Sequence, residues 1–330
     1  MAYSSGGLIA ATDYNGFVGS SPSSTANTLN TVWAIGNGQY GYGQTALSQV
    51  SSGASVVTAT QWASAINTLN SIRTHQSGSG TGISAPTSGS LAAYLSTFSS
   101  SIVTAYSSAL TFATQGSTTT GGNFAGSMAD SNLQAAFPTT FTRTATFASA
   151  DQARYFFNAG GQLNFVVSSA TNNDGTSRSG DMVTLAATNF GGFSAFRAAS
   201  GGGRTGSGGT LNTNATTIGY YNLTTSTQTL VSITSTTSGY TGDTAVLTVK
   251  SNGVQGSNAD VGSVVTFALT LTSAARPTLP APPANPPGTG TTTTNTVVND
   301  TINVTVNHRI DIVYPETTNL SNSWGTITIA

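Results

Sequence analysis

Residues that could carry acid–base or metal chemistry are scarce in this chain of 330 residues. It contains two histidines, no cysteine, and a single glutamate, Glu316. A Ser–His–Asp triad needs a histidine close to both a nucleophile and a carboxylate, and glycoside hydrolysis needs a pair of carboxylates. No spacing in the sequence singles out either arrangement. A hydrolytic enzyme, such as a polysaccharide depolymerase or lysin, is therefore the least favoured class of function.

The titratable residues that do occur are better explained by structural roles. His75 ends a predicted helix, where a cation interacts favourably with the helix dipole. His308 lies on the apolar side of a predicted strand, where we expect a buried ring with hydrogen bonds, or a ring stacked at a subunit axis, rather than a metal ligand. Asp174 and Asp181 bracket a loop and the start of a helix, so they are expected in turns or caps. The segment 172–175 has some residues of a calcium loop but lacks the remaining ligands. We expect no cofactor and no metal.

The elements that would position these residues give an α+β prediction. Apolar residues at helical spacing predict a helix from about 58 to 75, capped by Thr60, and a second from about 90 to 114. A shorter helix carries Leu29, Val32 and Trp33. We therefore expect residues 20–115 to be helical, as an antiparallel pair with a short third member.

The next part, residues 139–195, is predicted to be mixed. Alternation around Phe141–Phe147 predicts a strand, and Ser149 is expected to cap a helix that ends before Gly160. A strand from about 162 to 169 and a helix from about 179 to 190 follow. Residues 215–274 are predicted to be β-rich, with strands near 218–223, 229–234, 244–250 and 261–272, and an Asn252–Gly253 turn. Together these parts form a predicted scaffold domain, residues 1–274.

A Pro-rich linker, residues 275–290, is predicted to separate this scaffold from a C-terminal β segment, residues 291–330. Apolar or aromatic side chains alternate there, with a partner strand expected from Trp324 to Ile329. Two strands are too few to be stable alone in water. The segment must therefore dock on the first domain or pair with copies of itself. For the second case we predict an assembly interface formed by Ile302, Val304, Val306, His308, Ile310, Ile312, Tyr314 and Trp324.

Low charge is the dominant feature of the composition. Charged residues make up 6% of the chain and the formal net charge is −1, whereas ordinary domains carry about 25% charged residues. A net charge near zero favours association, so we expect an obligate assembly with copies of the chain and other proteins. The lack of a basic cluster argues against nucleic acid as a partner, and the lack of a long apolar run argues against a membrane span.

Three short phrases carry a resemblance to a known group of proteins. They are Gln39-Tyr40-Gly41-Tyr42-Gly43-Gln44, then Gln61-Trp62 with Arg73-Thr74-His75-Gln76-Ser77-Gly78, and Arg154-Tyr155-Phe156-Phe157-Asn158-Ala159-Gly160-Gly161-Gln162-Leu163. Over roughly residues 37–170, this pattern resembles uncharacterised virion structural proteins of tailed bacteriophages, including those that infect cyanobacteria. That group offers no catalytic residues to transfer to this sequence.

The resemblance implies a non-enzymatic subunit of a phage tail, in the baseplate or at a tail-fibre attachment. Such a protein would be made in the host cytoplasm and located in the virion. The alternative is a receptor-binding fibre or adhesin module, in which Tyr, Trp, Asn and Ser side chains would contact a glycan of the host surface. Binding to isolated glycans would distinguish the adhesin from the connector.

Overall fold

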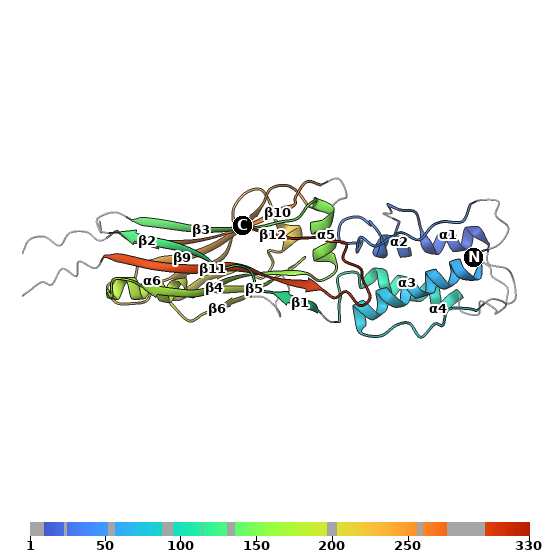
Figure 1. Ribbon diagram of the computed structural model, residues 1–330, viewed down its shortest axis with the longest axis horizontal. Coiled ribbons are helices and arrows are strands. Elements are labelled where there is room, and N and C mark those ends of the chain that lie inside the picture. The colour runs from blue at the N-terminus through green and yellow to red at the C-terminus, as the bar shows by residue number, and fades with distance from the viewer. Residues whose placement is uncertain are drawn as a thin grey trace, which may run out of the picture.

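The computed structural model describes residues 10–22, 25–51, 57–87, 95–113, 115–130, 136–196, 203–255, 260–275 and 301–330. Figure 1 shows an elongated molecule in which four helices occupy one end and the strands run through the other. The α+β class predicted from the sequence is confirmed. The Pro-rich residues 276–300 lie outside the described residues.

Six α-helices occur in the described part of the chain. Their bounds are α1 Ala11–Val18, α2 Leu29–Trp33, α3 Ala59–Ser77, α4 Leu95–Ser107, α5 Ala150–Asn158 and α6 Ser177–Ala186. Thr58, rather than Thr60, caps α3, because its side chain accepts from the Gln61 amide while the Gln61 side chain accepts from the Thr58 amide. This reciprocal pair is a capping box. Ser149 caps α5, as predicted.

The strands form two antiparallel sheets. Their bounds are β1 Gln115–Thr119, β2 Phe124–Asp130, β3 Phe137–Thr146, β4 Gln162–Asn172, β5 Asn189–Phe193, β6 Gly203–Thr205, β7 Thr210–Asn214, β8 Gln228–Thr234, β9 Thr244–Ser251, β10 Val264–Ser273, β11 Ile302–Pro315 and β12 Thr328–Ile329. The first sheet has the order β1-β11-β4-β5-β6, with β2 also paired to β11. The second has the order β12-β3-β10-β9-β8-β7.

The two sheets share one apolar interior with the helices. Phe193 and Phe165 of the first sheet contact Phe267 of the second, with ring centroids 5.3 and 6.2 Å apart. Within the helical part, Trp62 packs against Phe98 and Phe17 at 4.8 and 6.0 Å. These residues belong to a continuous cluster of buried side chains. The molecule is therefore held together by apolar burial along its length.

The C-terminal segment is built into both sheets. β11 lies between β4 on one side and β1 and β2 on the other, and β12 adds to β3 in the second sheet. Of the two alternatives left open by the sequence, the structure has the first: residues 301–330 dock on their own chain. Strands from the predicted mixed and C-terminal parts thus pair in both sheets, whereas β8, β9 and β10 of the predicted β-rich part lie together in the second.

Several local expectations need correction. Residues 324–327 are not a strand, and β12 pairs with β3 rather than with β11. The predicted strand near 218–223 contains instead a short 3₁₀ helix, Tyr220–Asn222, whose tyrosines pack inward. β9 ends at Ser251 and β10 begins at Val264, so Asn252–Gly253 is not a two-residue turn joining these strands. Five strands were not expected, namely β1, β2, β5, β6 and β7, because they are rich in Gly, Ser, Thr or Asn and lack apolar alternation.

The placement of β11 within its own chain can be tested with engineered cysteines, since the chain has none of its own. Thr305 of β11 is directly paired with Ser127 of β2, and cross-strand pairs have a Cα separation compatible with a disulfide. The double variant T305C/S127C is expected to form a disulfide within each monomer. Non-reducing mass analysis, with the two single variants as controls, measures this. Covalent dimers linked through 127 and 305 would contradict the placement.

Candidate functional site

A group of buried polar contacts lies where the helical part, α1 to α4, meets the two packed sheets, which we call the sandwich. We call this region of contact the junction: the loop 35–44, the C-terminal end of α3, the helix α5, and residues 316–324 that follow β11. Three of these four segments contain parts of the three phrases that resemble virion proteins; Gln61–Trp62 lies at the other end of α3. Sequence reasoning singled out the phrases but did not predict that they meet in space.

The loop 35–44 has a conformation that only glycine permits at key positions. Gly41 has φ of +97°, and a Cβ there would lie 2.0 Å from the carbonyl oxygen of Ile35. Gly43 has φ of +67°, and a Cβ there would lie 2.3 Å from the ring of Tyr155 on α5. Both φ values belong to the left-handed region that side chains disfavour. The alternation of Gly and Tyr is thus explained by close packing of the loop on α5.

Arg154 holds this loop from α5. Its guanidinium is buried and donates to the carbonyl oxygens of Tyr40 and Ile35, both at 2.8 Å. It also pairs with Asp151 one turn earlier, at 2.9 Å. The planar fork of an arginine can hold several acceptors in fixed directions. A buried charge is thereby used to fix main chain rather than to bind a ligand.

Asn158 and Tyr221 also form hydrogen bonds with the loop 35–44. The Asn158 amide donates to the carbonyl oxygens of Gly38 and Gly41, both at 3.1 Å. The Tyr221 hydroxyl lies 2.7 Å from both Gly38 O and Asn158 Oδ1. Burial raises the pKa of Tyr221 above its ordinary value, so the phenol stays protonated and remains available as a donor.

A second set of contacts ties the loop and α3 to the C-terminal segment. Gln44 donates to the Ser321 carbonyl at 2.9 Å and accepts from the Ser321 amide at 2.7 Å. His75 Nδ1 lies 3.0 Å from Glu316 Oε1, and Glu316 also accepts from the amide of Thr318 at 2.7 Å. The chain's only glutamate is therefore held in part by a histidine 241 positions away in sequence.

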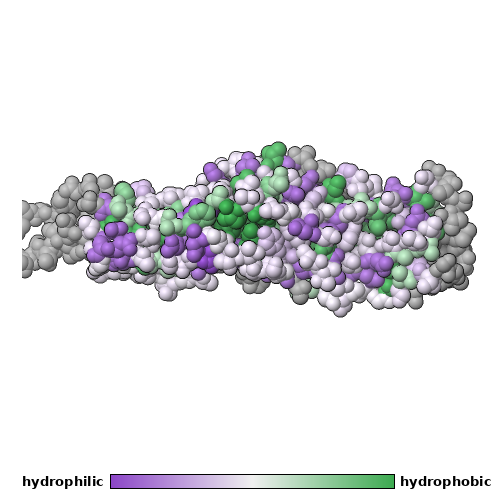
Figure 2. Space-filling view, viewed as in Figure 1, coloured by the Kyte–Doolittle hydropathy of each residue, from purple (hydrophilic) through white to green (hydrophobic). Residues whose placement is uncertain are grey.

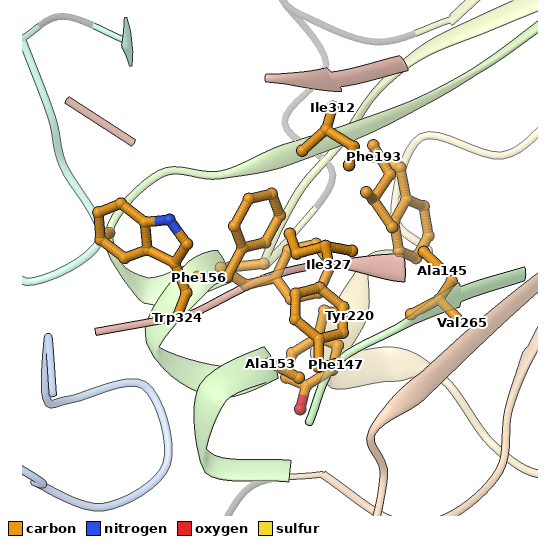
Figure 3. Close-up of a cluster of buried hydrophobic side chains, with 14 of the residues drawn as sticks. Ala145, Phe147, Ala153, Phe156, Phe193, Tyr220, Val265, Ile312, Trp324 and Ile327 are labelled. Carbon is orange, nitrogen blue, oxygen red and sulfur yellow. The ribbon is translucent and has the colours of Figure 1, made fainter. Parts of the chain in front are cut away.

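The same region is sealed by aromatic rings. Figure 3 shows Trp324 and Ile327 lying with Phe156 of α5, Phe147 and Tyr220. Trp324 is 1% exposed, and Tyr42 meets His75 edge-on with ring centroids 5.2 Å apart. Gln76 donates to the Tyr42 hydroxyl at 3.1 Å, which in turn donates to the Ala109 carbonyl at 2.7 Å. The junction is thus held by both apolar packing and hydrogen bonds.

The protonation states at the junction follow from burial. Burial lowers the pKa of His75 below 6.5, and this outweighs the opposing effect of Glu316. Burial acts to raise the pKa of Glu316, but hydrogen bonds from Asn319, His75 and Thr318 hold that pKa below 4.5. The pair is therefore a neutral imidazole whose Nδ1–H donates to a carboxylate. This hydrogen bond requires no buried positive charge.

These groups face the interior, so they are unsuited to catalysis. A general base must come within hydrogen-bond reach of a substrate proton, whereas His75 is 1% exposed. Among the described residues, no group of three His, Asp or Glu side chains could hold a metal ion. No helix in that part of the chain is long and apolar enough to cross a membrane. What the junction can do is fix one part of the molecule against another.

The residues predicted to form an assembly interface lie elsewhere, in the interior of their own chain. Side chains from Ile302 to Ile312 at alternate positions of β11 are buried between the sheets, as is Trp324 at the junction. Tyr314 is half-buried against Phe156, with centroids 6.2 Å apart. The interface prediction for Ile302, Val304, Val306, His308, Ile310, Ile312, Tyr314 and Trp324 is therefore corrected: these side chains are covered by their own chain, with β3, β4 and α6 along β11 and α5 at Tyr314. The alternation identified burial, but it could not identify the covering partner.

His308 and the two aspartates have structural surroundings. The His308 ring lies 5.3 Å from that of Phe141 and 6.2 Å from that of Phe165, and its Nε2 has no hydrogen-bond partner among the described residues. Asp174 is a turn residue, as predicted, and accepts from Thr176. Asp181 is not a cap: it is buried and accepts from the hydroxyls of Ser235 and Thr237.

Close packing of Gly43 predicts a position-specific stability effect. We expect G43A to lower the free energy of unfolding more than G82A, measured by urea denaturation. Gly82 has a similar φ of +75° but nothing within 4 Å of a Cβ, so G82A carries only the left-handed strain, about 1–2 kcal/mol. G43A should cost about 1–3 kcal/mol more, because the Tyr155 ring must move. Equal effects would show that the loop does not pack tightly on α5.

The buried histidines predict a loss of stability in mild acid. Burial lowers the pKa of both His75 and His308 in the folded chain, so the unfolded chain binds protons first. Stability should be complete above about pH 6.5 and fall as the pH decreases below it, by up to about 1.4 kcal/mol per pH unit for each histidine. Urea denaturation between pH 5 and 8 measures this. H308L should remove its share of the slope; an unchanged slope in that variant would contradict the assignment.

Comparisons of the chain with protein-family models, with curated proteins and with solved structures find no match.

Proposed function

We propose that the protein is a non-enzymatic structural subunit of a bacteriophage virion, most specifically of the tail, at the baseplate or at a tail-fibre attachment. The observation that carries the proposal is the junction. Its buried contacts bring together the phrases that resemble phage virion proteins, and they serve to join two parts of an elongated body. A rigid connector needs this property, whereas an enzyme would need an open cleft.

The surface supports the same proposal. Figure 2 shows a face on which residues of intermediate hydropathy predominate, with strongly hydrophilic and strongly hydrophobic residues in smaller, separate groups. Charged residues are only 6% of the chain. Such a surface offers many uncharged hydrogen-bonding groups and little long-range repulsion. It suits contacts with copies of the chain and with other tail proteins inside a particle.

The proposed mechanism is geometric. The helical part and the two sheets act as one body because Arg154 ties the loop 35–44 to α5, while Gln44 and Glu316 tie that loop and α3 to the C-terminal segment. A force applied at one end of the molecule is then transmitted to the other through hydrogen bonds and packed rings. In this proposal the residues of the junction have no reactive role, and their value lies in fixing distance and angle.

Crosslinking mass spectrometry on purified particles of the phage that encodes the chain tests this proposal. Because Lys250 is the only lysine, a photoactivatable crosslinker is needed in place of an amine-reactive one. We expect the chain to co-purify with particles in a fixed ratio to the tail proteins and to crosslink to them. Its presence in the lysate but absence from particles would refute the proposal. A host cytoplasmic protein serves as the control for carry-over.

A further inference from the structure

One edge of the second sheet is only partly covered. β10 pairs with all ten residues of β3, whereas on the opposite side β12 pairs only with Thr146 and Ala145. Ala330 then exchanges both backbone hydrogen bonds with Thr144, at 2.9 and 3.0 Å. From Phe137 to Arg143, β3 has no strand partner on this side in the described part of the chain. Figure 1 shows β3 along the margin of the sandwich, with β2 of the other sheet beside it.

In an antiparallel pair every second residue directs both its N–H and its C=O group to the same side, which identifies the backbone groups at this edge. Because Thr144 bonds to Ala330, the N–H and C=O groups of Thr142 and Thr140 point to the same side. The side chains of both threonines are exposed on the outer face. The open stretch is about 20 Å long at roughly 3.4 Å per residue, which is the length of an ordinary strand. It can therefore accept an added strand.

Arg143 and Pro138 both disfavour pairing of this edge with another copy of the chain. Its Nη1 donates to the carbonyl oxygen of Thr142 at 2.7 Å, and its guanidinium carbon lies 3.6 Å from the ring centre of Phe124 on β2. Pro138, further along the same edge, has no N–H to donate. An inward-pointing charge and a proline are both known devices that keep an open edge from pairing with another copy.

The charge of Arg143 is incompletely matched. Its Nε is buried without a hydrogen-bond partner among the described residues, and burial lowers its pKa. Other arginines of this sparsely charged chain pair with carboxylates, namely Arg154 with Asp151, Arg178 with Asp243 and Arg309 with Asp311. No ion pair of Arg143 occurs in the described part of the chain. The edge thus presents both backbone groups and a cation that lacks its anion.

We propose that the β3 edge from Pro138 to Thr142 is a docking site for an extended strand of another protein that carries a carboxylate. The carboxylate draws the Arg143 guanidinium away from Thr142, and the freed Thr142 carbonyl accepts an N–H from the incoming strand. A second copy paired through β3 does not match this site, because Phe137–Thr146 contains no Asp or Glu to supply the carboxylate. The site does not depend on the virion proposal, since it would serve any acidic strand.

The test uses the full-length, ¹⁵N-labelled chain and capped Thr/Val peptides of about nine residues, with Glu, Gln or Lys at the centre. We expect the Glu peptide to shift the amide signals of Thr140 and Thr142, and to bind about 10- to 100-fold more tightly than the Gln peptide. R143Q should abolish this preference, R143K should retain part of it, and R143E should reverse it towards the Lys peptide. R204Q, at the edge strand β6 of the other sheet, is the matched control and should bind as the parent chain does.

Two results would overturn the inference. One is the absence of shifts at Thr140 and Thr142 with every peptide, or equal binding of all three. The other is self-association of R143Q through β3, detected by light scattering, together with no peptide preference in the parent chain. Arg143 would then serve only to prevent pairing of copies. The dispersion of the ¹⁵N spectrum of each variant shows directly whether it folds. Failure of this test leaves the particle experiment unaffected, and the reverse also holds.

Discussion

The fold depends on the need of β11 to bury a row of side chains that is apolar except for His308. In the described part of the chain, β1 and β2 pair only with β11, so the first sheet would lose one whole side without it. The strand then leads directly into Glu316, Leu320 and Trp324, which fix the helical part and fill the junction. Burial of this row is thus coupled to the contacts that residues 316–324 make with the helical part. Removing it would leave the first sheet incomplete and the helical part held by fewer contacts, chiefly those of Arg154, Asn158 and Tyr221 with the loop 35–44.

The scarcity of charged residues is compatible with this fold, because several of the few that occur make specific buried contacts. Arg154 binds main-chain carbonyls, Arg178 lies against Asp243, and Glu316 receives a neutral histidine. Buried ion pairs contribute little net stability on average, because desolvation offsets attraction. Their geometry nevertheless excludes alternative arrangements of the loops they hold. Stability in this molecule comes from apolar packing, and the charges select which packing is adopted.

Strong periodicity allowed α3, α5, β4, β9 and β10 to be predicted from the sequence, because their buried faces repeat at helical or strand spacing. The strands β5, β6 and β7 could not be predicted, because their Gly-, Thr- and Asn-rich sequences carry no such pattern. The alternation in β11 correctly indicated a buried strand. It could not show whether the covering side chains belong to the same chain, since a neighbouring copy would impose the same pattern.

The junction was accessible to sequence reasoning only in part. Gly41, Gly43 and Arg154 lie in phrases that drew attention, but nothing in the sequence links them to residues 316–324. Glu316 offered a weak signal as the only glutamate of a chain that otherwise uses aspartate. Its partner, His75, was expected to be a terminal cation, whereas burial makes it a neutral donor. Long-range pairing of polar residues follows from topology, which a single sequence does not specify.

The central place of β11 also determines when the protein can fold. Gln115 pairs with Pro315 across the sheet, so β1 has no partner until the ribosome has made about 200 further residues. At roughly 5–20 residues per second this is a delay of about 10–40 s. During synthesis the edges of β1, β2 and β4 that pair with β11 remain uncovered. Chains that end before Ile302 therefore cannot complete the first sheet.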